Sequence, residues 1–313
     1  MRVAALAGGI GGGKFLRGLV RVVPPSNVTA VVNTGDDVVM HGLHVSPDLD
    51  SVTYWLGDAF DRERGWGRRG ETFRSNEELR AFDPGLAWFG LGDLDLATHL
   101  FRTSLLSSGS SLSEVTARIS ARFGVAARLL PMSDEPVTTR IIVVADGEEL
   151  DLHFQEYWVR RGARDEVKAV RYEGAASARP APGVLEAIDA ADVVVLCPSN
   201  PVASIGPILS VPGVREALAR RRNRVVGISG IVGGAPLVGM ADKLMPAAGV
   251  EVTAAGAADC YRGLLGAWVV DEADRGLVPR IEADGVRVGV TDSIMTGDAK
   301  AEALARSALG LLE

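Results

Sequence analysis

Several features that would set a chain apart from ordinary globular proteins are missing from this sequence. No apolar run among its 313 residues reaches the roughly 18 residues that a membrane-spanning helix needs. The apolar run at residues 1–10 breaks into glycines, so it is predicted to be a buried first strand and not a signal peptide. The only two cysteines, Cys197 and Cys260, have no metal-binding spacing. These absences predict a cytoplasmic protein that does not contact a membrane.

Positive charge is also scarce. The net charge is −7, and only four of the 33 basic residues are lysines, so no broad surface for nucleic acid is expected. The four histidines are scattered without the spacing of a metal site. No Ser-His-Asp or Cys-His arrangement suggests a covalent nucleophile. What remains is a chain with 47% hydrophobic residues, which is enough to bury a substantial core.

The order of apolar segments predicts a doubly wound α/β fold. A strand at 2–7, glycines, a helix from 14 to 22 and a strand at 28–33 begin a mostly parallel, Rossmann-like sheet. Strand patterns at 138–144 and 148–154 flank Asp146-Gly147, which predicts an antiparallel hairpin. We therefore expect one domain over 1–313 with an inserted subdomain at about 140–180. Further predictions are a loop leading into a helix at 48–60, helices at 111–123, 184–189, 214–222 and 298–311, and strands at 192–197, 225–228 and 286–290.

A glycine-rich segment follows the first strand. Its residues are Gly8, Gly9, Ile10, Gly11, Gly12, Gly13 and Lys14. Glycines let a backbone approach phosphate closely, and the next helix offers free N–H groups. Phe15 stands where a P-loop needs a hydroxyl, and the dinucleotide glycine pattern also fails. We predict a phosphate-binding loop of a third kind; the alternative is a turn whose glycines serve only packing.

Carboxylates follow the second strand and precede a helix. Asp36 and Asp37 lie at the carboxyl edge of the predicted sheet, where they are expected to bind magnesium or sugar hydroxyls unless they form only a solvated turn. Asp48 and Asp50 follow Pro47, and such a pair holds magnesium or takes a proton from an attacking hydroxyl. Plain helix capping is the alternative for this second pair.

Two more segments are candidate pocket walls. Ser199 and Asn200 lie between prolines directly after a predicted strand, which places a hydroxyl and an amide toward a ligand. The segment from Trp88 through Gly90 to residue 95 either walls a pocket for a flat ring or belongs to the core.

These motifs, in this order, resemble the 2-phospho-L-lactate transferase family of deazaflavin coenzyme F-420 biosynthesis. The resemblance runs over nearly the whole chain and includes AGGIGGGKFLRGL, NTGDD, HGLHVSPDLDS, WFGLGDLDLATHL, FQEYWV, PSNPVASIGPIL, GMADKLM and TDSIM. It implies a homodimer that requires Mg²⁺. The implied reaction moves a phosphorylated small acid from a guanosine diphosphate donor to a hydroxyl of the deazaflavin Fo, with release of GMP.

The resemblance also implies roles for individual residues. Asp50 is expected to be catalytic beside the reacting hydroxyl of Fo, which Asp48, Trp88 and Gly90 also contact. Some relatives have a longer polar residue where this chain has Gly90, and proline where it has Gly230. The nucleotide is expected over Gly9, Gly11, Gly12, Gly13 and Lys14 and near Ser199 and Asn200, and the metal at Asp36, Asp37 and Asp48.

The donor acid stays open among phospholactate, phosphoenolpyruvate and phosphoglycerate, because small groups are distinguished by few contacts. A non-catalytic group of UDP-sugar-binding regulatory proteins shares the glycine loop, but it usually has an Asp-Gly-Gly-Ser-Ser-Gly run where this chain has 35–38. A Rossmann dehydrogenase is the weaker rival, because its glycine fingerprint is absent.

Overall fold

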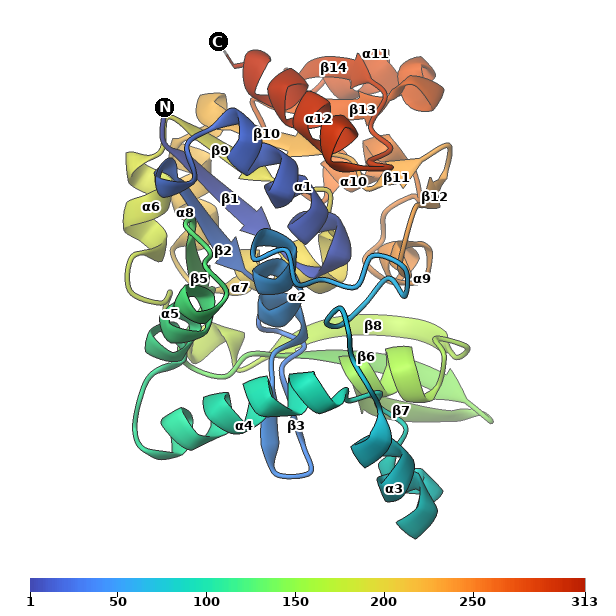
Figure 1. Ribbon diagram of the computed structural model, residues 1–313. Coiled ribbons are helices and arrows are strands. Elements are labelled where there is room, and N and C mark those ends of the chain that lie inside the picture. The colour runs from blue at the N-terminus through green and yellow to red at the C-terminus, as the bar shows by residue number, and fades with distance from the viewer. Residues whose placement is uncertain (313) are drawn as a thin grey trace.

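Seven parallel strands form the central sheet of the computed structural model, which describes residues 1–312 (Figure 1). Their order is β14-β13-β10-β9-β1-β2-β5, and every neighbouring pair is parallel. The strands are β1 (Val3–Ala7), β2 (Val28–Val32), β5 (Arg128–Pro131), β9 (Val193–Leu196), β10 (Val225–Ile228), β13 (Ala267–Asp271) and β14 (Arg287–Thr291). The doubly wound, mostly parallel fold predicted from the sequence is confirmed.

Helices cover both faces of this sheet, as its continuous apolar strands require. Alternate residues of β1 divide between two cores: Val3 and Ala5 pack with α1 and α12, whereas Ala4 and Leu6 pack toward the opposite face. The helices are α1 (Gly9–Val22), α2 (Pro47–Leu56), α3 (Arg74–Phe82), α4 (Asp93–Ser107), α5 (Leu112–Arg122), α6 (Val184–Ala190), α7 (Gly206–Ser210), α8 (Val214–Arg220), α9 (Ala241–Ala247), α10 (Ala254–Asp259), α11 (Val278–Glu282) and α12 (Asp298–Gly310). Within residues 1–312, no helix has both the length and the apolar character needed to cross a bilayer.

The predicted inserted hairpin is present and belongs to a small antiparallel sheet. Its order is β7-β6-β8, and Ala145 pairs with Glu148 across the Asp146-Gly147 turn. Figure 1 shows this sheet below the carboxyl edge of the central sheet, together with α3 and α4. The remaining strands are β3 (Val38–Met40), β4 (Leu43–Val45), β6 (Thr138–Ala145), β7 (Glu148–His153), β8 (Glu166–Glu173), β11 (Ile231–Val232) and β12 (Ala235–Pro236). That the whole chain is one domain stays a prediction.

Two helices at the ligand edge of the sheet begin earlier in the chain than the sequence predicted. Helix α1 begins at Gly9 and not at Lys14, so the glycine-rich segment forms its first turn. Glycine's low helix propensity hides this turn in the sequence, although its packing against the sheet stabilises it. Helix α2 begins at Pro47, which places Asp50 in the first turn of a helix and not at the end of a loop.

The strand order reverses between β1 and β9. From β1 the chain moves outward to β2 and β5, whereas β9 leads to β10, β13 and β14 on the other side. Ligands of open α/β sheets bind at such a switch point, outside the carboxyl ends of the strands. The backbone that follows β1 lies in contact with the backbone that follows β9. The contact is so close that a side chain at Gly11 would collide with the carbonyl oxygen of Pro198.

Candidate active site

A cavity of about 800 Å³ opens at this switch point. Its volume lies within the range of small-molecule sites in proteins. Its lining includes the start of α1 and several aromatic side chains. Of the residues predicted for the site, those that line it are Gly9, Gly11, Lys14, Asp36, Asp48, Asp50, Gly90, Ser199 and Asn200. Gly12, Gly13, Asp37 and Trp88 are not among the lining residues.

The N-terminus of α1 forms a polar part of the cavity wall. Gly8 is its N-cap residue and supplies no side-chain cap, and no acidic residue lies in its first turn. The Asp48 carboxylate accepts a hydrogen bond from the Gly9 backbone, and the positive end of the helix dipole faces the cavity, which favours a bound phosphate. Lys14 lines the cavity one turn further on. Burial, with a smaller contribution from Arg62, lowers the pKa of Lys14.

Gly12 and Gly13 serve packing in this structure. A β-carbon at Gly12 would lie 2.8 Å from the hydroxyl oxygen of Ser199 and 3.1 Å from the β-carbon of Ala7. A β-carbon at Gly13 would collide with the indole of Trp55. A valine at Gly12 would therefore overpack the contact between α1 and β1, in addition to any effect on a ligand.

The amide of Asn33 joins two buried carboxylates. Its Nδ2 atom donates to Oδ1 of Asp36 at 2.8 Å and to Oδ2 of Asp48 at 2.9 Å. Gln155, from the inserted region, donates to the other oxygen of Asp36 at 3.0 Å. Burial, followed by the charges of Asp48 and Asp37, raises the pKa of Asp36 well above its usual value, and burial raises the pKa of Asp48 to about 7. A cation between the two carboxylates would relieve this repulsion.

Asp37 points elsewhere. Its Oδ2 atom accepts a hydrogen bond from the hydroxyl of Ser46 at 2.7 Å and lies 3.0 Å from Nε2 of His44. No group of three or more His, Cys, Asp or Glu side chains in residues 1–312 is arranged to hold a metal. Asp36 and Asp48 nevertheless fit Mg²⁺, which binds through one or two carboxylates plus substrate phosphates and water.

Asp50 forms a buried ion pair with Arg102 of α4. The guanidinium binds both carboxylate oxygens, and its Nη1 atom lies 3.1 Å from Oδ2 of Asp50. The same Nη1 atom also donates to the backbone oxygen of His44 at 3.3 Å. Burial lowers the pKa of His99, whose ring also contacts Arg102, to about 4, so His99 is neutral near pH 7. Arg102 is thus the cation that fixes the charge and orientation of Asp50.

A second carboxyl group at the same wall is Asp95, also on α4. Burial raises its pKa to about 7, with the nearby charges of Asp50 and Glu71 adding to the rise. Its Oδ1 atom is buried without a hydrogen-bond partner. This wall of the cavity therefore holds Asp50, which is paired with a cation, and Asp95, which changes between its charged and neutral forms near neutral pH.

Aromatic side chains also line the cavity, and they include Trp66, Phe89 and Trp158. The ring of Trp66 lies against Gly90, since a β-carbon there would be 2.9 Å from its Cη2 atom. Trp88 instead packs with the small cluster around Met40, with its ring edge-on to Phe89 at 5.7 Å between centroids. Phe89, and not Trp88, is the aromatic residue of this segment that lines the cavity.

Ser199 and Asn200 line the cavity, but both also have structural hydrogen bonds. The Ser199 hydroxyl donates to the backbone oxygen of Gly8 at 2.8 Å. The Asn200 side-chain oxygen accepts from the backbone nitrogens of Val202 and Ala203 at 2.9 and 3.0 Å, and so caps the turn that follows. The Ser199 bond holds the end of β9 against the end of β1 beside the cavity.

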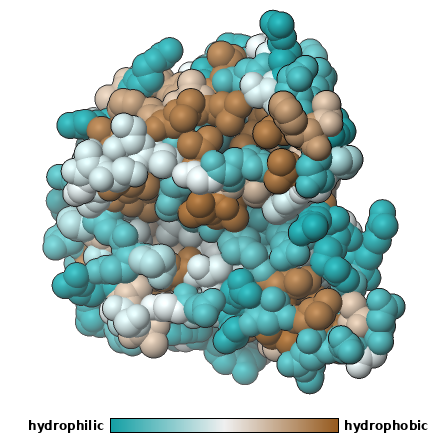
Figure 2. Space-filling view, turned by 90° about the horizontal axis from the view of Figure 1, so that it is seen from below, coloured by the Kyte–Doolittle hydropathy of each residue, from teal (hydrophilic) through white to brown (hydrophobic). Residues whose placement is uncertain are grey.

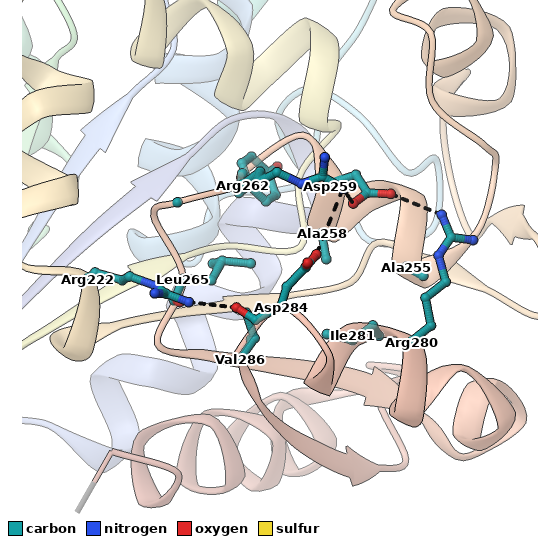
Figure 3. A pocket seen from close by; sticks show the side chains of 12 residues that line it. Arg222, Ala255, Ala258, Asp259, Arg262, Leu265, Arg280, Ile281, Asp284 and Val286 are labelled. Atoms are coloured by element: carbon teal, nitrogen blue, oxygen red, sulfur yellow. Dashed lines mark hydrogen bonds and ion pairs between the residues drawn. The ribbon is translucent and has the colours of Figure 1, made fainter.

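A second cavity of about 220 Å³ lies among charged side chains at the opposite edge of the sheet (Figure 3). Residues that precede β10, β13 and β14 line it. Its guanidinium groups already have partners: Arg262 and Arg280 bind Asp259 at 2.8 and 3.0 Å, and Arg222 donates to the backbone oxygen of Asp284 at 2.9 Å. This cavity is therefore not a candidate for the ligand site.

Five side chains that shape the site were not predicted from local sequence patterns, and they come from three segments of the chain. Arg102 and His99 lie on a helix whose function no local pattern indicated, although Arg102 is a lone cation in an uncharged stretch. Gln155 and Trp158 belong to the FQEYWV segment, which entered only through the resemblance. Trp66 lies in a loop without a motif.

A doubly wound sheet whose ligand edge gathers a helix N-terminus and buried carboxylates is typical of enzymes that act on phosphorylated substrates. Comparison with known proteins agrees. The chain is 53% identical to a Streptomyces griseus protein named phosphoenolpyruvate transferase, over 100% of this chain and 99% of that protein. It is 43% identical to a Mycolicibacterium smegmatis protein of the same name, over 99% and 98% of the two chains. A solved Bacillus halodurans structure, 21% identical, shares the fold, with a TM-score of 0.65 over 100% of this chain and 99% of that one.

A family model described as 2-phospho-L-lactate transferase CofD matches residues 3–304. The chain belongs to this family, and it is a phospho-acid transferase. The resemblance drawn from the sequence motifs is thereby confirmed.

Proposed function

We propose that the chain transfers the phosphoenolpyruvyl group of a GDP-linked donor to a ribityl hydroxyl of the deazaflavin Fo. The reaction releases GMP and forms the dehydro form of coenzyme F-420-0. The choice of donor acid rests on the names of the relatives, which are 42–53% identical to this chain. By the same resemblance we propose a cytoplasmic homodimer that requires Mg²⁺.

The observation that best supports this proposal is the mixed lining of the cavity. The start of α1 with Lys14 lines it, and so do Trp66, Phe89 and Trp158. A nucleoside diphosphate needs the first environment, and a flat, tricyclic deazaflavin needs the second. Asp36, Asp48 and Asp50 line the same cavity.

Transfer at a diphosphate depends mainly on alignment and on neutralisation of charge. Mg²⁺ held by Asp36 and Asp48 would neutralise the diphosphate as charge moves to GMP. Lys14 and the N–H groups of α1 would bind the phosphate oxygens. Asn33 holds the two carboxylates in position for the metal.

Asp50 has two possible roles, which kinetics can separate. As a proton acceptor it would take the hydroxyl proton of Fo during attack on phosphorus. As an orienting group it would only accept a hydrogen bond from Fo. Arg102 binds both carboxylate oxygens of Asp50, so in either role Fo must share Asp50 with this guanidinium.

The test is a product assay. The protein is incubated with Mg²⁺, Fo and, separately, the guanosine diphosphate ester of enolpyruvate, lactate or glycerate, and each product is weighed by mass spectrometry. We expect product and GMP fastest with the phosphoenolpyruvate donor. No product with any of the three would refute the transfer, and a preference for another donor would refute the choice of acid. Fluorescence titration with a UDP-sugar tests the rival binding function.

A further inference from the structure

Two of the five tryptophans are exposed, and both line the cavity. Trp66 is 42% exposed and Trp158 is 38% exposed, whereas Trp55 and Trp268 are buried. Exposed apolar residues also occur on the outer surface, where the face seen from below has hydrophobic patches among hydrophilic residues (Figure 2). Exposure by itself therefore does not mark a ligand contact. Trp66 differs from other exposed residues in the way that the chain holds its ring.

Trp66 lies in the loop between α2 and α3, and hydrogen bonds close this loop on itself. The Asp61 nitrogen donates to the Gly67 backbone oxygen at 3.0 Å, and the Gly65 nitrogen donates to the Asp61 backbone oxygen at 3.0 Å. Gly65 and Gly67, on either side of Trp66, have φ angles of +83° and +70°. Other residues are strained in this left-handed region, so the two glycines let the backbone turn at the tryptophan.

Neighbouring side chains hold the Trp66 ring. The Arg64 guanidinium lies over it, 5.1 Å from the ring centroid, and is itself fixed by a hydrogen bond to the Asp61 carboxylate at 2.7 Å. The Phe73 ring lies 5.5 Å from the Trp66 ring between centroids. A ring that is already held loses little conformational freedom when a flat ligand stacks on it, and this favours binding.

Gly90 leaves the space that the Trp66 ring occupies. A β-carbon at Gly90 would lie 2.9 Å from Cη2 of Trp66, and its three nearest neighbours would all be atoms of this ring. Gly90 is not among the glycines with positive φ, so its backbone conformation is open to other residues. The glycine is therefore needed at this position for space and not for backbone conformation.

We infer that Trp66, in the space left by Gly90, is the surface on which the flat ring of the deazaflavin acceptor stacks. The inference rests on the proposed function, because it names the contact for the acceptor of that reaction. Tryptophan offers a large, rigid ring face, and stacking on such a face is the general way in which proteins bind flat conjugated rings.

The guanine of the donor is the other flat ring in the proposed reaction, but the position of the loop favours the acceptor. Arg68, from the loop that carries Trp66, donates to the backbone oxygen of Leu94 in α4 at 2.7 Å. The same helix carries Arg102, which holds Asp50. Trp66 is thus attached to the wall where the hydroxyl of Fo is expected to meet Asp50.

The test is a titration of the full-length protein with Fo, without Mg²⁺ or donor, followed by the fluorescence of Fo. Trp66→Ala should weaken Fo binding about 5- to 150-fold, as when an aromatic residue that stacks on a nucleobase is replaced by alanine. Trp66→Phe should keep part of the affinity. The matched control is Phe82→Ala, which should bind Fo like wild type, because Phe82 is 84% exposed on α3 and does not line the cavity.

Gly90→Ala tests whether the two residues act as a pair. Its β-carbon would displace the Trp66 ring, so it should weaken Fo binding about fivefold or more when Trp66 is present. It should have no further effect in the Trp66→Ala background, because the ring is then absent. Circular dichroism and GDP binding in the presence of Mg²⁺ should be unchanged in every variant.

Three results would overturn the inference. Trp66→Ala binds Fo like wild type, or Gly90→Ala has the same effect with and without Trp66, or Trp66→Ala loses affinity for GDP and keeps it for Fo, which would assign the surface to guanine. The proposed function fails in a different way. A wild type that binds Fo through Trp66 but forms no product refutes the transfer and supports this inference, whereas a wild type that does not bind Fo refutes both.

Discussion

Replacing Arg102 by methionine should destabilise the protein far more than the loss of an ordinary ion pair. Arg102 is only 2% exposed and binds both oxygens of Asp50, which is itself buried. The variant leaves the Asp50 carboxylate buried without a cation. His99 cannot take over, because burial holds its pKa near 4 and it is neutral at pH 7.

The expected cost follows from this burial. Removing one partner of a buried ion pair typically lowers the free energy of unfolding by about 3–5 kcal/mol. The matched control is Arg306→Met. Arg306 pairs with Glu302 at 2.9 Å on the surface of α12, and its side chain is 61% exposed. Exposed pairs one helical turn apart contribute only about 0.3–0.5 kcal/mol.

Urea unfolding, followed by circular dichroism, measures both costs in the same protein. The double variant Arg102→Met/Asp50→Asn should recover part of the lost stability, because the unpaired charge is then gone. If Arg102→Met costs no more than Arg306→Met, the reasoning is wrong. The same holds if the double variant is no more stable than Arg102→Met alone.

Four further predictions concern ligands and pH. Lys14→Ala should weaken GDP binding about 10- to 150-fold, since a charge-assisted phosphate contact contributes about 1.5–3 kcal/mol, while Fo binding by fluorescence stays unchanged; equal loss for both ligands would contradict the assignment. Asp50→Asn should lower turnover at saturating Fo about 100- to 10,000-fold if Asp50 accepts the proton, whereas a change confined to Fo affinity would show that it only orients Fo. In the presence of Mg²⁺, GDP at 100 times its dissociation constant should raise the unfolding free energy of wild type by about 2.7 kcal/mol. Asp36→Asn should lose this gain, and a gain kept in full would exclude Asp36 as a ligand of Mg²⁺. Burial raises the folded-state pKa of Asp95 to about 7, so the folded protein binds a proton that the unfolded chain has released, and stability falls as pH rises between about 4 and about 7. Asp95→Asn should remove this fall, gaining up to about 4 kcal/mol over wild type above that window; parallel pH curves for the two proteins would refute it.

Helices and strands that depend on short-range sequence patterns were predicted well. Strand β10 begins and ends at the residues expected, and the helix expected at 111–123 is present as α5, which Ser111 and Glu114 cap. Strand β13 was missed because its short apolar run, at residues 267–270, does not distinguish a strand from a helix. Helix α4 was missed because its buried residues are polar, which does not fit the pattern of a surface helix.

The part of the site that lies at the strand ends was predictable from the topology of the sheet. Residues that follow β1, β2 and β9 must meet, because the carboxyl ends of parallel strands share one edge. Arg102, Gln155 and Trp66 come from outside the sheet. Their partners are Asp50, Asp36 and Gly90, which lie 52, 119 and 24 residues away along the chain, respectively. No local pattern encodes such pairings, so only the three-dimensional structure identifies them.

Helix α1 follows a glycine that supplies no side-chain cap, so its first turn depends on groups outside the helix. The Asp48 carboxylate bonds the N–H of Gly9, and the N–H groups of the residues that follow have no side-chain cap. Under the proposed function, the donor's phosphate would bind those groups, and amide hydrogen exchange in residues 9–12 would slow on binding. The helix end would then report occupancy of the site directly, as a local change in stability that occurs before any chemistry.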